Sequence, residues 1–393
     1  MLKTIMKWIG TGGEELTLGS GSAGTAIKSC KITQCVNDGE DLTPGSCCAA
    51  VAEIVVITSN ALSITGGTKF SLFKEDDAGV QHQIGIFTAE KPTRTSANSY
   101  KITAYDNMIK LDRDFSRDRN LMALMWAIRD GTAQFNLAGL ANYICLGCEL
   151  GKIVTEDFPN AQMIVPPFDL AGCTGRKIMR WISECAGCFC RADSNGAIRL
   201  QQFSGDPVVT IRPTGSRYYF SGSLSYEDFS VPAVDGVGYW VDGAYYEFVD
   251  PGLGHAPENP FVIGEDNRLW KASVDPDGNT AALYNQLVAV GAYRPCKVSI
   301  PACLDIHAGD VVSIVTPSNE NLRMLVMTKV TSGQRDTLEC TGSISRGSSS
   351  AVCGIGTGSS PNLSEQDILD RLGAAWRDIN GVITLVKKED IPK

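Results

Sequence analysis

Two pairs of cysteines have a spacing that could bind a metal ion. Cys145 and Cys148 form one Cys-x-x-Cys pair, and Cys185 and Cys188 form a second. Together they could supply the four thiolates of a tetrahedral zinc site. The surrounding sequence favours buried thiols instead, because the first three can occupy apolar helix faces and the turns of a zinc knuckle are missing. We therefore predict four reduced, metal-free cysteines, and we expect no cofactor.

The three histidines offer little catalytic chemistry. His307 lies near Asp305 and Asp310 in the sequence, while His82 and His255 stand apart from it. Nucleophilic catalysis needs a nucleophile, a base and an orienting group held together, and no known motif surrounds any serine or cysteine here. We therefore expect that the chain is not an enzyme.

Two loop motifs lack the context that their chemistry requires. The run from Gly19 to Gly24 matches G-x-G-x-x-G, but Thr25 to Val36 reads as a strand, so no helix N-terminus is available for a phosphate. The run from Asp275 to Asn279 has its glycine too early for a Ca²⁺ loop, and Gln286 stands where a bidentate Glu belongs. The first motif predicts a glycine-rich loop, and the second predicts a turn.

Composition limits the classes of function. The chain has 393 residues, 43% hydrophobic and 20% charged, which is enough for about two to four domains. Its net charge of −9 lacks the basic footprint of a protein that binds nucleic acid specifically. No apolar run approaches the roughly 18 residues of a membrane span or forms a secretion signal. The fourteen cysteines are therefore interpreted as buried thiols of a chain made in the cytoplasm.

The elements that hold the second cysteine pair are the clearest in the chain. Thr174 is a plausible N-cap, and apolar residues at helical spacing follow it until Gly187. The segments Cys188 to Ala192 and Ala197 to Phe203 then read as strands, joined by a turn that contains Asn195-Gly196. The pattern predicts a helix followed by a hairpin.

Short β-rich runs precede and follow this unit. Strands are predicted at 26–36, 52–58, 69–74, 81–89 and 99–105, and in the last of these every second residue fits a buried face. Helical periodicity predicts two short helices between Arg113 and Val165, and a further helix is predicted at Thr280 to Ala292. The C-terminal half otherwise returns to β-rich texture.

The C-terminal region changes character twice. Residues from Thr341 to Ser360 are rich in Gly and Ser, which predicts a flexible linker. Ser364 to Asp367 then resembles a capping box, and the following apolar residues have the spacing of an a/d seam. These candidate oligomerisation residues are Ile368, Leu372, Ala375 and Ile379. The alternative is a helix packed back on the preceding β domain.

Several of these segments resemble the hub proteins of bacteriophage tail tips and baseplates. The helix and hairpin, with "AGCF" after the helix and "IRLQQF" in the last strand, are similar to the middle domain of that family. "GIF" at Gly85 to Phe87 and "YKITAYD" at Tyr100 to Asp106 resemble its first β-barrel. Tyr293-Arg294-Pro295 and Gly309-Asp310 resemble short signatures of its second barrel.

The resemblance implies an α+β, mainly β fold with two similar antiparallel β-barrels. The expected domains are a first barrel (1–112), an inserted α+β domain (113–203), a return to the first barrel (204–230), a second barrel with a helical insertion (231–342), a linker (343–362), and a C-terminal helix and tail (363–393).

The resemblance also implies a structural role at the virion tail tip. Hubs of this family are ring-shaped homotrimers that join the hexameric tail tube or distal tail protein to fibre, spike or tip proteins and line the DNA passage. The tape measure protein is a further expected partner, whereas specific nucleic-acid binding and a membrane span are not expected. The alternative function is a tail-associated enzyme that degrades the cell wall, an endopeptidase or lysin.

Overall fold

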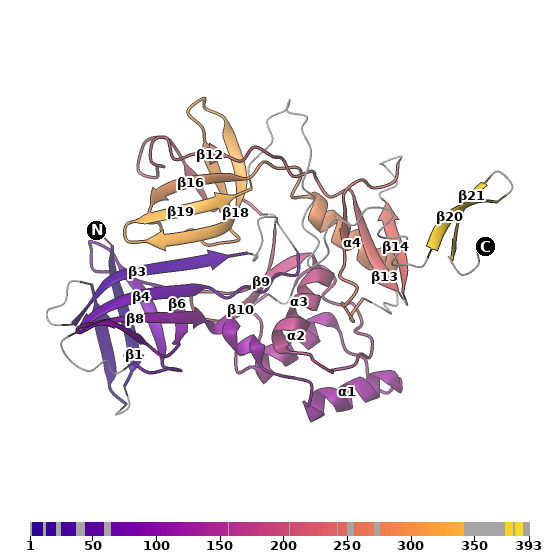
Figure 1. The fold of residues 1–393 in the computed structure, drawn as a ribbon, viewed down its shortest axis with the longest axis horizontal. Coiled ribbons are helices and arrows are strands. Elements are labelled where there is room, and N and C mark those ends of the chain that lie inside the picture. Colours follow the sequence, from indigo (N-terminus) through magenta and orange to yellow (C-terminus); the bar gives the residue numbers. More distant parts are fainter. Residues whose placement is uncertain are drawn as a thin grey trace.

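The architecture is mainly β, with antiparallel sheets and few helices, which confirms the predicted fold class. In this computed structural model the described residues are 2–10, 13–20, 25–36, 44–58, 64–155, 157–203, 205–241, 243–249, 255–270, 276–341, 374–379 and 382–387. Figure 1 shows two groups of strands, one above the other, and a helical region beside them.

The first group of strands, here the first β unit, is formed by residues 2–106. Its strands are β1 (Lys3–Ile9), β2 (Glu15–Gly19), β3 (Thr25–Cys35), β4 (Val51–Thr58), β5 (Lys69–Glu75), β6 (Gln81–Ala89), β7 (Thr93–Ser96) and β8 (Ser99–Asp106). Pairing follows the order β3-β4-β8-β6-β5-β1-β2, with β7 on β8. The five strands predicted in this region are confirmed. A β2–β3 pairing, which would close a barrel, is not found among the described residues.

Alternating side chains fill the core of the first β unit. In β4, Ala52, Ile54 and Val56 are fully buried while the residues between them face outward. The rings of Phe70 and Phe87 stack with their centroids 6.0 Å apart. This period of two is what a sheet with one buried face requires.

The middle unit contains the helices. Its first part has a 3₁₀ helix, η1 (Asn107–Asp112), then α1 (Arg119–Arg129), α2 (Leu137–Gly147), α3 (Gly175–Ala186), β9 (Cys188–Ala192) and β10 (Ile198–Gln202). The Thr174 hydroxyl accepts from the amide of Lys177 at 3.2 Å, and Gly187 ends α3 in the left-handed conformation at φ 60°. The predicted helix, its two caps and the hairpin β9–β10 are therefore confirmed.

Residues 231–293 also belong to the middle unit, although we expected them in the second barrel. They form β13 (Gly236–Val241), β14 (Ala244–Val249), β15 (Pro260–Val262) and α4 (Pro276–Val288), so the supposed turn at 275–279 lies largely in the first turn of a helix. Val237, Tyr239 and Trp270 share one continuous core with α2 and α3. Burial of this apolar face against α3, rather than chain continuity with the later strands, decides the boundary.

The second β unit is built from residues 205–230 and 294–341. Its strands are β11 (Val209–Ile211), β12 (Ser225–Tyr226), β16 (Cys296–Pro301), β17 (Val311–Val315), β18 (Asn321–Ser332) and β19 (Arg335–Cys340). β11 pairs with β17 and β12 pairs with β16. The expected return of 204–230 to the first barrel is therefore corrected, because Ile211 and Tyr219 bury their side chains in the core of the second β unit.

One long strand joins the two β units. The first half of β18 pairs with β17, and its second half, Thr328 to Ser332, pairs antiparallel with Lys31 to Cys35 of β3. The result is a continuous 14-stranded sheet. In Figure 1, β3 and β18 run beside each other where the indigo and orange strands meet.

The predicted C-terminal helix is wrong where the structure describes it. Residues Ala374–Ile379 (β20) and Val382–Lys387 (β21) form an antiparallel hairpin with Ile379 opposite Val382. The intervening sequence, Asn380-Gly381, is a strong hairpin signal, and the β-branched residues that follow favour a strand. An a/d seam of about two heptads is too short to outweigh these preferences.

Candidate functional site

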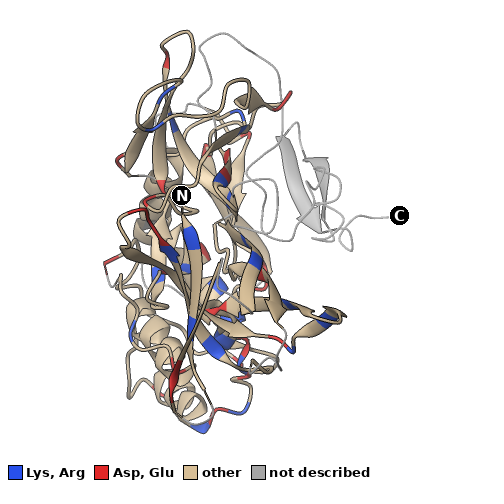
Figure 2. Ribbon diagram, turned by 90° about the vertical axis from the view of Figure 1, so that its left-hand side faces the viewer, with Lys and Arg blue, Asp and Glu red and all other residues tan. Residues whose placement is uncertain are grey.

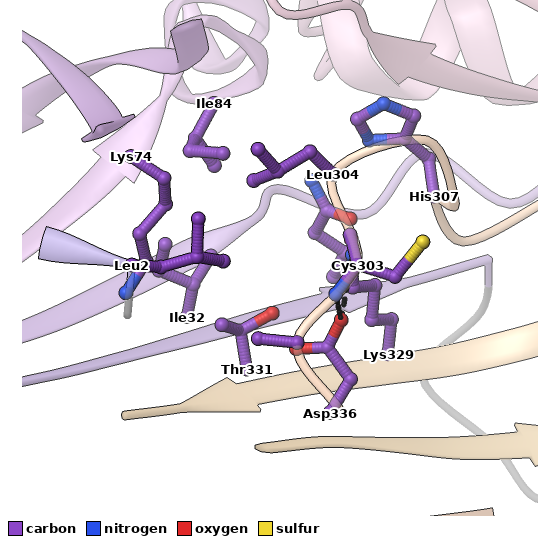
Figure 3. Close-up of a pocket in the computed structure, with 12 residues that line it drawn as sticks. Leu2, Ile32, Lys74, Ile84, Cys303, Leu304, His307, Lys329, Thr331 and Asp336 are labelled. Carbon is purple, nitrogen blue, oxygen red and sulfur yellow. Dashed lines mark hydrogen bonds and ion pairs between the residues drawn. The ribbon is translucent and has the colours of Figure 1, made fainter. Parts of the chain in front are cut away.

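A small cavity lies where the two β units meet (Figure 3). It is bordered by the start of β1, by β3, β5 and β6 of the first unit, and by β18, β19 and the loop after β16 in the second. Its lining residues are Leu2, Ile32, Gln34, Lys74, Ile84, Ala302, Cys303, Leu304, His307, Lys329, Thr331 and Asp336. Its volume of about 10 Å³ has room for about one water molecule. The cavity is too small for a substrate, so we interpret its polar groups as contacts that stabilise the junction between the two β units.

A buried ion pair holds the second β unit's side of this junction. The Nζ of Lys329 lies 3.1 Å from Oδ2 of Asp336, and both side chains are almost fully buried. The same ammonium donates to the carbonyls of Cys303 and Ile306, each at 2.6 Å. The amide of Cys303 donates to Asp336 Oδ2 at 2.8 Å. The pair thus fixes the loop after β16 against β18 and β19.

Lys74 approaches the same cavity from the first β unit. Its ammonium is buried and donates to the hydroxyl of Thr4 at 2.9 Å. Burial lowers the pKa of Lys74, although the Asp336 carboxylate across the junction favours its charged form. Oδ1 of Asp336 has no hydrogen-bond partner among the described residues. One water between Lys74 and Asp336 would satisfy both groups.

The start of the chain provides a second link. The amide of Leu2 donates to Oε1 of Gln334 at 2.9 Å, and Nε2 of Gln334 donates to the carbonyl of Leu2 at 2.5 Å. Gln334 lies in the turn between β18 and β19. The β1 strand therefore begins on the second β unit before it enters the first.

His307 borders the cavity but lacks the partners of a catalytic base. Burial, together with the charges of Lys329 and Arg191, lowers the pKa of His307 to about 4. Its backbone amide donates to Asp310 at 2.7 Å, while Asp305 pairs with Arg217. Within the described residues its ring makes no hydrogen bond to a Ser, Thr or Cys side chain. This surrounding fits a structural role for the imidazole.

An open groove lies on the outer side of the same loop. It has a volume of about 400 Å³, and its accessible apolar lining includes Val209, Tyr218 and Pro301. The ion pair between Arg217 and Asp305 lies at its rim. This size is in the range of ligand and side-chain binding pockets.

The four predicted cysteines lie in the middle unit. Cys145 is on α2, Cys148 caps it, Cys185 is on α3 and Cys188 begins β9, and all are buried. Burial raises the pKa of Cys145 to about 12 and that of Cys148 to about 11.

The second pair makes separate contacts. Cys185 lies 3.9 Å from Oδ1 of Asn267, and Cys188 donates to the carbonyl of Ala186 at 3.3 Å. Among the described residues, no group of three or more His, Cys, Asp or Glu side chains is arranged to hold a metal ion. The reduced, metal-free state stays a prediction.

The C-terminal candidates are only partly described. Ala375 and Ile379 lie in β20, whereas Ile368 and Leu372 lie outside the described residues.

Sequence reasoning missed the charged groups of the junction, although a signal was present. Lys74 follows the buried Phe70 and Leu72 at a period of two, and Asp336 precedes the buried Leu338 in the same way. A charged residue on the buried parity of a strand indicates a buried polar contact.

The fold has relatives among solved phage structures. A tail protein from Neisseria meningitidis MC58 is 12% identical over 86% of this chain and 96% of its own, with a TM-score of 0.52. The chain shares the fold of this tail protein. The prophage MuSo2 43 kDa tail protein from Shewanella oneidensis (12% identity, 86% and 97% coverage, TM-score 0.49) and prophage tail protein gp18 from Listeria monocytogenes EGD-e (10%, 86% and 94%, 0.47) also match. No family model and no curated protein matches the sequence.

No helix of the described residues is long and apolar enough to cross a membrane.

Proposed function

We propose that this chain is a structural hub of a phage or prophage-derived tail tip. The observation that carries the proposal is the likeness of its fold to the Neisseria tail protein, which extends over 86% of this chain and 96% of that one. Because the likeness covers most of both chains, it supports a role for the architecture as a whole.

The joined β units suit a load-transmitting ring. The β3–β18 pairing and the two hydrogen bonds between Leu2 and Gln334 fix one β unit relative to the other. Three chains with two such units each would present six β surfaces to a six-fold tube. The proposed assembly is therefore a ring-shaped homotrimer between the tail tube or distal tail protein and the fibre, spike or tip proteins, with the tape measure protein as a further neighbour.

The charge distribution fits passage of DNA without tight binding. Figure 2 shows acidic and basic residues interspersed along the described chain, and the net charge is −9. Phosphate binding needs clustered Lys and Arg. A lumen formed by this chain would let DNA slide through it.

The proposed role is structural rather than enzymatic. The surroundings of His307 and the small volume of the junction cavity support this view. A zymogram of the purified chain on host cell walls is expected to show no clearing. Clearing that survives further purification would favour the cell-wall-degrading alternative.

Electron microscopy of the phage particle tests the hub role directly. With this chain labelled, we expect three copies in one ring at the distal end of the tail tube. Six copies, or none at that end, would reject the proposal.

A further inference from the structure

Helix α1 presents apolar side chains on two sides. Its inner side packs Leu121 and Met125 into the core of the middle unit, and Asp118 caps its first turn by accepting from the Leu121 amide at 2.9 Å. Figure 1 shows α1 at an outer edge of the molecule, below α2. The outer side of the helix is thus available to another molecule.

The outer side has the pattern of a docking helix. Arg119, Met122, Trp126 and Arg129 follow one another at spacings of three, four and three residues, so they form one stripe. Met122 is 42% exposed and Trp126 is 60% exposed. The guanidinium of Arg129 lies 5.4 Å from the Trp126 ring centroid. An apolar centre with an arginine at each end is typical of a helix that inserts into a groove.

The described chain contains a groove of matching character. The groove on the second β unit measures about 400 Å³, and its accessible apolar lining includes Val209, Tyr218 and Pro301. The Asp305 side chain at its rim is 62% exposed. It already binds Arg217, but a carboxylate has room for a second guanidinium. The apolar lining thus matches Met122 and Trp126, and the Asp305 carboxylate offers an acceptor to an arginine of the stripe.

The two surfaces lie on different parts of one chain. Figure 1 places α1 on the side of the molecule opposite β16, which borders the groove. A contact between them therefore joins two copies through unlike surfaces. Such head-to-tail contacts build rings when the rotation between copies closes.

We propose that α1 of one copy docks in the groove of a second copy of this chain. Met122 and Trp126 insert against Val209, Tyr218 and Pro301, and Arg119 or Arg129 binds Asp305. The closure of these contacts after three copies rests on the proposed homotrimeric hub. The docking contact itself does not depend on the position of the ring in the virion.

A photo-cross-link tests the contact in the full chain. The Trp126→benzoylphenylalanine variant is prepared once with and once without an isotope label. The two preparations are mixed at the highest concentration at which the protein stays monodisperse, and the mixture is irradiated. Mass spectrometry is expected to find cross-links between copies that join position 126 to peptides 209–218 or 300–306. Cross-links to other segments, cross-links within one copy only, or none at all would overturn the docking contact.

Two variants give an independent readout by sedimentation equilibrium. Trp126→Ala removes the central side chain and is expected to weaken self-association by about 30-fold or more. Tyr218→Asp, on the groove wall, is expected to weaken it as well. Ile9→Ala is the matched control, because Ile9 is 63% exposed on the first β unit. Equal effects of Trp126→Ala and the control would refute the proposal, and thermal melts check that each variant is folded.

The two proposals fail in different ways. A three-copy ring in the particle with Trp126 far from the groove would reject the docking contact and keep the hub. Cross-links at the expected peptides, with no copies in the tail, would keep the docking contact and reject the hub.

Discussion

Replacing Lys329 by Met tests the account of the junction between the β units. The change removes an ammonium that bonds Asp336 at 3.1 Å and two carbonyls at 2.6 Å each. Asp336 is fully buried, so its carboxylate would lose its closest cation without gaining water. Loss of one partner of a buried pair costs about 3–5 kcal/mol. For a chain of this kind that lowers the midpoint of thermal unfolding by on the order of 10 °C.

Two companion variants separate the buried charge from side effects of the substitution. Lys297→Met is the control, because Lys297 pairs with Glu339 at 2.8 Å on the neighbouring strands with both side chains about half exposed. Its cost is expected to be about 0–1 kcal/mol. The double variant Lys329→Met with Asp336→Leu is expected to recover part of the loss, because it removes the unpaired carboxylate but leaves the buried Lys74 ammonium and the Cys303 amide without Asp336.

Calorimetry and urea unfolding measure these free energies. Hydrogen exchange shows which part of the chain is destabilised. Exchange is expected to rise first at the β3–β18 pairing, from Lys31 to Cys35 and from Thr328 to Ser332. The reasoning would be refuted if Lys329→Met cost no more than Lys297→Met. It would also fail if the double variant lost as much unfolding free energy as the two single variants together.

The remaining predictions concern the middle unit. Burial raises the pKa of Glu184 from 4.5 to about 7, so its contribution to stability is fully present below about pH 4.5 and is lost as the pH rises through about 7. The unfolding free energy of the original protein is therefore expected to fall by about 3 kcal/mol more than that of Glu184→Gln between about pH 5 and about pH 8. Denaturant titrations of both proteins at both pH values measure this difference. Gly187→Ala is expected to cost about 1–3 kcal/mol, because φ is +60° and the new Cβ would lie 2.7 Å from Leu283. Gly291→Ala, at φ +70° with nothing within 4 Å, is its control, and thermal melts that show equal losses would mean that the contact with Leu283 is unimportant. The two Cys-x-x-Cys pairs are expected to hold no zinc: elemental analysis should find none, and chelator should leave the melting curve unchanged.

Local elements of this protein follow from local sequence. Thr174 and Gly187 mark the ends of α3 because a side-chain hydroxyl satisfies its first amides and only glycine readily adopts φ 60° at its end. The alternation in β4 and β5 fixes which face of each strand is buried. The same rule would have placed Lys74 in the interior, and Asn380-Gly381 would have predicted the last hairpin. These were signals in the sequence that we did not use.

Only the tertiary structure decides how the elements combine. The β3–β18 pairing joins residues from opposite ends of the chain, and neither strand carries a local pattern that selects the other as its partner. The assignment of Ile211 to the second β unit and of Val237 to the middle unit likewise depends on which apolar surface each one covers. Such choices minimise exposed apolar area over the whole molecule, and a strand's period of two reveals that it has a buried face but not what lies against it.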